Sequence, residues 1–395
     1  MKGYKARLFP TKEQEAKLWK HINAARWTWN WCLAKQLENF KDGKPFISSY
    51  AMRDMWRNER PGWVKECAPN SLIESIFDLD NAYKRFFNIQ KTGERFTKKK
   101  REWAKRKKKP LTLMDMNGHP QYKSKHSAKP SFGLQCDKIS FYENGVVLTK
   151  IGRVKYRTDA QVMLGSQAMK KNLKNPRIAY IGDKWILSFS MEALQIKPQL
   201  TEKCIGIDLG LKTLATISCD GEIIKIKNIN KTKRIMGLEK KLRRVQQKAA
   251  RRVKGSKNQQ KVNEQVGKQM AQLRNIRRDY THKATRKVVD MLPRTICMED
   301  LRVKNMMSNK HLAKHIQDAC WGEFARQIQY KSAWQGTLYI EADRWEPSSK
   351  RCSECGNIKR DLRLSERIYK CNNCNLVIDR DDNAARNLER LAQSA

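Results

Sequence analysis

Four cysteines near the end of the chain have the spacing of a zinc site. Cys352 and Cys355 form one CxxC pair, and Cys371 and Cys374 form a second pair after fifteen intervening residues. Two such pairs supply the four thiolates that bind one tetrahedral Zn²⁺ in a zinc ribbon. Four unrelated buried cysteines would not fall into pairs beside basic and turn-forming residues. We therefore expect one structural zinc ion at these four residues.

Three carboxylates lie at or just beyond the ends of apolar segments that read as strands. Asp208 belongs to the segment 204–210, Glu299 ends the segment 295–299, and Asp381 follows 376–378, where helical periodicity begins. An acid at the start of a helix is often only an N-cap, and one at a strand end is often a surface charge. Metal-dependent nucleases, however, use about three carboxylates to hold two divalent ions roughly 4 Å apart. Asp208, Glu299 and Asp381 are therefore our candidate catalytic residues and ligands of two Mg²⁺ ions.

The segment 204–226 indicates the fold that would bring these acids together. A buried strand ending in an acid next to glycine, followed by a hairpin, opens the ribonuclease-H-like fold, whose strand ends converge on a metal site. Actin-like ATPases open in the same way. An ATPase of that class needs a second glycine-rich phosphate loop, and the sequence contains none.

The charge of the chain points to a polyanionic partner. Its 395 residues carry 83 Lys and Arg against 40 Asp and Glu, a formal net charge of +43. Nucleic acid releases counterions when basic side chains replace them, and solubility alone does not require this excess. No long apolar run or signal peptide is present, which argues against a membrane partner. Four of the eleven cysteines pair as metal ligands and the rest are scattered, a usage typical of a reducing, cytosolic setting.

The first half of the chain alternates between strand and helical patterns. The segment 4–8 reads as a strand, and Thr11 with Gln14 forms a capping box before a long helix. Further helices are expected at 50–57 and 72–89. From about residue 127 the period is that of strands, with hairpins over 139–149 and 177–190. Together with the first strand, these hairpins predict a small β-barrel interrupted by helices. The long helix also carries Trp19, Trp27, Trp29 and Trp31, which could stack on bases but are expected mostly in the core.

Basic residues gather in two places. One is the segment 91–110, and the other is a pair of helices over 231–289 that a break at 254–258 turns into a hairpin. A segment like the first is commonly a solvated linker, and a pair like the second is commonly a solubilising coiled coil. The charge of the whole chain favours phosphate contacts instead. Our candidate nucleic-acid contacts are Lys98, Lys99, Lys100, Arg101, Arg243, Arg244, Arg251 and Arg252. A helix over 311–334 and a strand over 338–341 then lead to the zinc ribbon.

At these residues the sequence resembles a known family, the TnpB proteins of bacterial insertion sequences and the miniature type V CRISPR effectors related to them. The resemblance covers nearly the whole chain and follows the order acid, acid, zinc ribbon, acid. It rests on 4–10 with the capped helix, Gly206-Ile207-Asp208-Leu209-Gly210, Glu299-Asp300-Leu301, Pro347-Ser348-Ser349-Lys350, the four cysteines and 379–385. One departure is Asn375, where the family usually has Gly. Asn also tolerates a left-handed turn, so zinc binding is expected to persist.

The resemblance implies a multidomain α+β fold. A β-barrel wedge domain would comprise 1–10 and 127–200, and a helical recognition domain with a basic linker would comprise 11–126. A ribonuclease-H-like (RuvC) α/β nuclease domain would comprise 201–346 and 377–395, with the zinc ribbon inserted at 347–376.

The resemblance also implies the function of an RNA-guided, Mg²⁺-dependent DNA endonuclease. Its partners would be a guide RNA and a double-stranded target DNA, with no membrane, and it would act in the bacterial cytoplasm on the nucleoid. Two other functions stay open, a nuclease-silent RNA-guided repressor and a transposase that joins DNA ends. An intact set of three acids favours cleavage over the first, and a two-metal site alone does not imply the strand transfer of the second.

Overall fold

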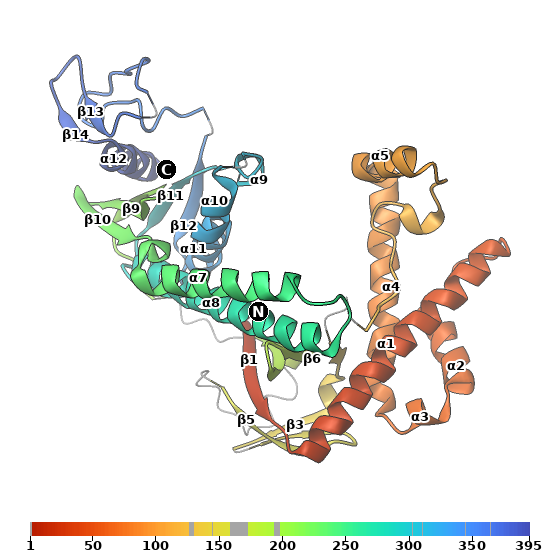
Figure 1. Cartoon of the computed structure of the whole chain (residues 1–395). Coiled ribbons are helices and arrows are strands. Elements are labelled where there is room, and N and C mark those ends of the chain that lie inside the picture. Colours follow the sequence, from red (N-terminus) through yellow and green to blue (C-terminus); the bar gives the residue numbers. More distant parts are fainter. Residues whose placement is uncertain are drawn as a thin grey trace. The chain divides into compact units, whose positions relative to one another are not determined.

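A computed structural model describes residues 2–125, 130–143, 145–158, 173–192, 198–301, 303–309, 311–343, 345–363 and 365–395. The chain divides into two compact units, Met1–Ala193 and Leu194–Ala395, which are described separately below (Figure 1). None of the helices in the described ranges combines the length and the apolar character that crossing a membrane requires.

The helices expected in the first unit are present, and two further helices, α3 and α5, were not predicted. Helix α1 (Lys12–Lys41) starts at the expected capping box, in which Thr11 and Gln14 exchange hydrogen bonds between side chain and backbone. The predicted helices at 50–57 and 72–89 are confirmed as α2 (Ser49–Glu59) and α4 (Pro69–Thr92), with the short α3 (Gly62–Lys65) between them. Helix α5 (Lys98–Lys107) buries no residue and lies near one end of α4 (Figure 1). A single 3₁₀ turn (Leu113–Asp115) follows.

The strands of the first unit form one antiparallel sheet with β1 near its middle. The order is β2-β6-β7-β1-β5-β4-β3. The bounds are β1 Lys2–Phe9, β2 Ser131–Gly133, β3 Ile139–Tyr142, β4 Gly145–Leu148, β5 Gly152–Arg157, β6 Leu173–Ile181 and β7 Lys184–Met191, with a 3₁₀ turn at Cys136–Lys138. Both expected hairpins are present, although Asn144, in the turn of the first, and residues 126–129 lie outside the described residues.

This sheet is strongly curled. Phe141 of β3 contacts Phe189 of β7 with a ring-centroid distance of 5.2 Å, although three strands lie between them in the sheet. The pairings among the described strands leave β2 and β3 as edges, so they give a curled open sheet, and closure into a barrel stays a prediction. The concave face and the helices share one hydrophobic core, which includes Leu18, Leu33, Leu72 and Leu187.

The second unit has a five-stranded sheet with helices on both faces. Its order is β10-β9-β8-β11-β12, in which β8, β11 and β12 are parallel and β9 runs antiparallel to both neighbours. The bounds are β8 Cys204–Leu209, β9 Thr213–Cys219, β10 Glu222–Lys227, β11 Thr295–Glu299 and β12 Leu338–Ala342. Side chains of β8 alternate between the faces. Ile205 and Ile207 join the core beneath α8 and α11, whereas Gly206 and Asp208 face α12.

The helices of this unit include the predicted basic hairpin. Its arms are α7 (Lys233–Ala250), which follows a 3₁₀ turn (Ile229–Lys231), and α8 (Lys257–Val289). Short α9 (Val303–Met306) follows β11. The single helix expected over 311–334 is wrong: it is two helices, α10 (Ala313–Ala319) and α11 (Trp321–Gln335). They separate at Cys320, whose φ of 57° is left-handed and cannot continue a helix.

The last elements are the expected zinc ribbon and the terminal helix. Strands β13 (Ile368–Lys370) and β14 (Val377–Asp379) pair antiparallel, and α12 (Arg380–Gln393) follows directly. Helix α12 contacts β8, β9 and β11, so it covers the face of the sheet opposite α8 and α11. In Figure 1 the ribbon strands lie beside the start of α12.

Candidate active site and zinc ribbon

Gly206 sets the distance between the central strand and α12. A Cβ atom at this position would lie 2.2 Å from both the carbonyl oxygen of Ala385 and the backbone nitrogen of Glu389. The helix backbone therefore rests directly on β8, which only glycine permits. Asp208 lies two residues, about 6.6 Å, further along β8 on the same face. Asp381 lies four residues, about 6 Å, before Ala385 on the helix. This close packing brings the Asp381 end of α12 to Asp208.

Glu299 reaches the same place from β11. The parallel register pairs Met298 with Ile207, so the next residue, Glu299, comes level with Asp208 on the same face of the sheet. The hydroxyl of Ser348 donates a hydrogen bond of 2.5 Å to Oε1 of Glu299. One carboxylate oxygen of Glu299 is thereby held in place, and the other is left for a ligand.

Asp381 is not the cap of its helix. That role belongs to Asp379, whose carboxylate accepts hydrogen bonds from the backbone nitrogens of Asp381 (2.9 Å) and Asp382 (3.4 Å). Lys225 of β10 pairs with Asp382 at 2.6 Å and also lies 3.9 Å from Asp379. Asp381 has a weaker neighbour, Arg367, at 3.9 Å. The local contacts thus occupy the two flanking acids and leave the carboxylate of Asp381 accessible.

The three predicted acids influence one another electrostatically. Asp208 is 9% exposed, and burial raises its pKa well above the usual value. The charges of Glu299 and then Asp381 raise that pKa further, whereas the nearby Arg380 lowers it. A buried carboxylate surrounded by carboxylates is costly unless a cation offsets the repulsion. The donor set consists of oxygen atoms, the ligands that Mg²⁺ prefers, so these residues fit divalent cations.

The four cysteines form the tightest candidate metal site in the described part of the chain. Their sulfur atoms all lie within 4.8 Å of one another, with 3.5 Å between Cys352 and Cys374 and 3.6 Å between Cys355 and Cys371. Zn–S bonds of about 2.3 Å in a tetrahedron place sulfurs roughly 3.8 Å apart. The cluster therefore fits a tetrahedral ion such as Zn²⁺.

The knuckles favour the thiolate at Cys355 and Cys371, whereas burial and the neighbouring cysteines raise the pKa of Cys374 to about 12. Backbone N–H groups of Glu354 and Asn373 donate to the sulfurs of Cys352 and Cys371, both at 3.4 Å. The side chain of Asn373 is the main cause that lowers the pKa of Cys355 to about 6. Asn375 has a φ of 59°, so Asn adopts the left-handed turn that the resemblance assigned to Gly.

Two asparagines on α12 fasten the ribbon to this helix. Asn383 accepts a buried hydrogen bond from the backbone nitrogen of Ser353 (2.9 Å) and donates to the carbonyl of Arg351 (2.7 Å). Asn387, one turn later, donates to the carbonyls of Ser348 and Arg351, each at 2.7 Å. Neither asparagine is among the site residues predicted from the sequence. The available signal was their spacing of four on an otherwise apolar helix face.

Removing the metal from the ribbon is expected to destabilise the second unit. We predict one zinc per chain, and we predict that Cys355→Ser lowers both the zinc content and the melting temperature. Metal binding contributes directly to the folding of small ribbons, and a loss of about 2 kcal/mol corresponds to ~4–8 °C in a unit of this size. Elemental analysis and calorimetry measure both quantities. Cys136→Ser, at a half-buried cysteine outside the cluster, is the control and should change neither. An unchanged zinc content in Cys355→Ser would contradict the site.

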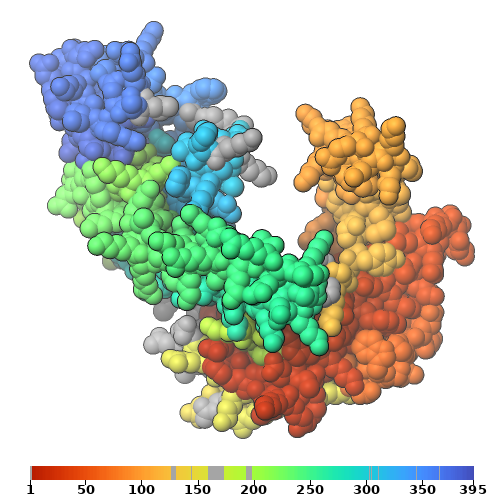
Figure 2. All heavy atoms as spheres, viewed as in Figure 1, coloured from red at the N-terminus to blue at the C-terminus, as the bar shows by residue number. Residues whose placement is uncertain are grey.

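The predicted nucleic-acid contacts lie on two exposed surfaces. Lys98, Lys99, Lys100 and Arg101 form the start of α5, and Arg243, Arg244, Arg251 and Arg252 lie on α7 and just after it. All eight side chains are exposed, and Figure 2 shows the surface of the segments that contain α5 and α7. Lys100 pairs with Asp115 and Arg101 pairs with Glu94, at 2.7 and 2.8 Å. These positions are accessible to a polyanion, and their contacts with one stay a prediction.

Comparisons with protein families find three matching models. A helix-turn-helix domain of the OrfB_IS605 type matches residues 1–45, a probable transposase of the same type matches 188–310, and a Cas12f1-like TNB domain matches 321–388. The last range holds Cys352 to Cys374. The first range is not a helix-turn-helix in this structure, because it contains β1 followed by the single helix α1.

Similar proteins span almost the whole chain. A putative RNA-guided DNA endonuclease of Streptomyces pristinaespiralis is 27% identical over 98% of this chain and 88% of its own length. The putative RNA-guided DNA endonuclease InsQ of Escherichia coli K12 is 29% identical over 98% of this chain and 91% of its own length. Among solved structures, the mini-RNA-guided endonuclease CRISPR-Cas_phi3 is similar in fold, with a TM-score of 0.54, 11% identity and coverage of 99% and 92%.

Proposed function

We propose that this chain, a member of the TnpB family that includes the miniature type V CRISPR effectors, is an RNA-guided DNA endonuclease. One observation carries the proposal. Asp208, Glu299 and Asp381 come from three distant segments, and the carboxylate of Asp208 is buried where the charges of the other two reach it. A binding protein without cleavage has no use for a buried carboxylate that two other carboxylates repel.

The acids would hold two Mg²⁺ ions. Bound there, the ions would activate a water and stabilise charge on the scissile phosphate and the leaving oxygen. Asp208 and Glu299 are level on adjacent strands, and Asp381 faces them from the start of α12. Because the two ions of such sites lie about 4 Å apart, their ligands need not crowd around one point as the cysteines do. Ser348 orients Glu299, and Lys225 neutralises the flanking acids, which keeps them from competing for the ions.

The rest of the chain would bind the nucleic acids. We assign 1–10 and 127–200 to a wedge domain with a closed barrel, 11–126 to helical recognition, 201–346 with 377–395 to a RuvC-like nuclease, and 347–376 to the ribbon. Base pairing to the guide would specify the target, while basic side chains on α5 and α7 hold phosphates. The bacterial relatives favour action in the cytoplasm, on the nucleoid.

The direct test supplies the protein with its own RNA. The chain is expressed together with the DNA that flanks its gene, and the copurifying RNA is sequenced. The complex is then incubated with Mg²⁺ and a plasmid library that carries the matching target beside randomised bases. We expect cleavage that depends on the match. Uncut DNA with RNA still bound would indicate the repressor instead, and joined DNA ends would indicate a transposase.

Ser348→Ala is expected to slow cleavage by about tenfold and to raise the Mg²⁺ concentration needed for half-maximal rate. The variant removes one hydrogen bond to a charged group, a contact of ~1.5–3 kcal/mol, and frees the rotamer of Glu299. Its backbone carbonyl still accepts from Asn387. Cleavage rates across a Mg²⁺ titration measure both effects.

The adjacent serine is the matched control for this variant. No side-chain hydrogen bond to Ser349 is found among the described residues, so Ser349→Ala should behave like the natural chain. A natural rate for Ser348→Ala at every Mg²⁺ concentration would show that Glu299 needs no support from the ribbon.

A further inference from the structure

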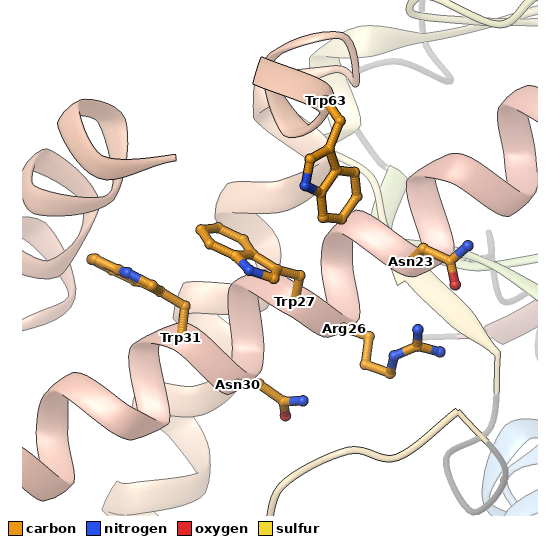
Figure 3. A pocket seen from close by; sticks show the side chains of 6 residues that line it. All are labelled: Asn23, Arg26, Trp27, Asn30, Trp31 and Trp63. Atoms are coloured by element: carbon orange, nitrogen blue, oxygen red, sulfur yellow. The ribbon is translucent and has the colours of Figure 1, made fainter. Parts of the chain in front are cut away.

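Three tryptophans form a notch on the surface of the first unit. Trp27 and Trp31 are one turn apart on α1, with their ring centroids 6.2 Å apart and their planes at 24°. Trp63 of α3 reaches toward them, 6.3 Å from Trp27 and nearly perpendicular to it (Figure 3). The ring of Trp29, by contrast, is buried. Trp27 and Trp31 are only half-buried and Trp63 is 39% exposed, so the notch keeps aromatic surface that the core does not use.

Polar side chains border the tryptophan notch. It encloses about 300 Å³ and is completed by Asn23, Arg26 and Asn30. Asn30 is already engaged, because its side-chain amide exchanges two hydrogen bonds with the backbone of Lys123. Within the described part of the chain, Asn23 and Arg26 have no hydrogen-bonding or ionic partner. Figure 3 shows both side chains on the far side of Trp27 from Trp31. A guanidinium and an amide thus lie beside an aromatic wall with no partner among the residues that the structure describes.

A larger basic hollow continues from the notch. It encloses about 780 Å³ and shares Asn23 and Arg26 with the notch. Its other charged lining residues are Lys123, Lys125, Arg177 and Asp78, and Asp78 pairs with Arg177 at 2.6 Å. Once Asp78 and Arg177 are paired, the other charged side chains that line the hollow are cations. The two hollows together offer aromatic faces at one end and positive charge at the other.

We propose that the tryptophan notch and the basic hollow bind a single-stranded segment of nucleic acid. An unpaired base stacks on the indoles, and the adjoining phosphates lie at Arg26 and the basic hollow. Every base has a π face, and stacking on an aromatic side chain is the usual way in which proteins hold unpaired bases. A paired base cannot stack in this way. The net charge of +43 and the cations of the basic hollow favour a polyanion over a peptide or an apolar ligand.

The inference deepens the proposed function by naming what this surface binds, and its test does not involve cleavage. The full chain, freed of RNA at high salt, is titrated with fluorescein-labelled single-stranded RNA and DNA 15-mers and with a duplex of the same length. Trp27→Leu keeps apolar bulk but removes the stacking face. We expect it to weaken single-strand binding by ~10- to 100-fold and duplex binding by less than about twofold. Trp27→Phe should restore most of the loss.

Arg26→Gln should act differently from Trp27→Leu. Losing one phosphate contact reduces the slope of log affinity against log salt by about one, whereas Trp27→Leu leaves that slope unchanged. Tyr50→Leu is the control, because Tyr50 is a 63% exposed aromatic residue of the same unit outside both hollows. Its affinities should equal those of the natural chain.

The arms of the titration distinguish the source of the base. A loss confined to RNA identifies the guide, a loss confined to DNA identifies a target strand, and either result supports the site. Natural affinity in a Trp27→Leu protein of normal melting temperature overturns the proposal, as does an equal loss for single strand and duplex. If Trp27→Leu lowers the melting temperature, the titrations are repeated with Trp63→Leu. This variant changes a more exposed residue of the notch, and the same outcomes support or overturn the proposal. Failure of guided cleavage would leave these affinities unchanged, so the two proposals fail separately.

Discussion

Asp208→Asn is expected to reduce guided cleavage by on the order of 1,000-fold while raising the melting temperature of the metal-free protein. The two effects have one cause. Burial of the carboxylate, and then the charges of Glu299 and Asp381, raise its pKa well above the usual value. Asn has nearly the same shape but no charge, so it removes the repulsion together with a ligand that the reaction needs.

The direction of the stability change follows from proton linkage. A carboxyl group whose pKa is raised in the folded state binds protons more tightly when folded, so its contribution to stability falls as pH rises above its unfolded pKa of about 3.9. At neutral pH the ionised Asp208 therefore destabilises the metal-free fold. Removing even about 1 kcal/mol of this strain raises the melting temperature of a 150–250-residue unit by ~2–4 °C.

Added Mg²⁺ should reverse the order of the melting temperatures of the two proteins. A ligand that binds only the folded state raises the melting temperature, so the natural chain should respond to Mg²⁺ and Asp208→Asn should respond much less. Asp279→Asn is the matched control, because Asp279 is 62% exposed on α8, where it pairs with Lys283. It should keep both the cleavage rate and the response to Mg²⁺. A lower melting temperature for metal-free Asp208→Asn would show that the acids do not repel one another.

Local patterns were sufficient to predict the elements that carry the site. The buried apolar run of β8, the capping box of Thr11 and the spacing of the cysteine pairs each depend on residues close together in sequence. The left-handed turn at Asn375 is equally local. These features are set by the local geometry of the backbone and the knuckles, and tertiary packing changes them little.

Contacts between distant segments could not be predicted in the same way. Ser348 gave no sign that it would bond Glu299, because the partner is 49 positions away and the contact exists only once the ribbon is docked. The break at Cys320 was equally hidden, since the apolar periodicity continues through it. No sequence signal marks the left-handed backbone at this position. The tryptophans of α1 divide between core and surface because α4 and the sheet cover only part of that helix, which periodicity cannot specify.

Gly206 shows how one such distant contact controls the whole site. Gly206→Ala places a methyl group 2.2 Å from backbone atoms of Ala385 and Glu389 and 2.7 Å from the carbonyl carbon of Leu388. No side chain can rotate to make room, so α12 itself must move. We expect a loss of about 3 kcal/mol, or ~6–12 °C, and a severe loss of cleavage. Calorimetry and the guided cleavage assay measure the two effects.

The severity follows from what α12 carries. Its first turn contains Asp381, and Asn383 and Asn387 hold the backbone that leads into the ribbon, including the Ser348 that orients Glu299. Glu389 is buried and accepts a hydrogen bond from Ser218 of β9. A shift of the helix therefore displaces one acid directly and a second through the ribbon.

Gly237→Ala separates this packing effect from the general cost of replacing glycine. Gly237 lies within α7, where an added Cβ meets nothing within 4 Å. Alanine has the higher helix propensity, so this variant should be more stable by about 0.5–1 kcal/mol and should cleave normally. If Gly206→Ala matched it in melting temperature and activity, α12 could not rest on β8 as the structure shows. Asp381 would then have to reach Asp208 by some other packing of the helix.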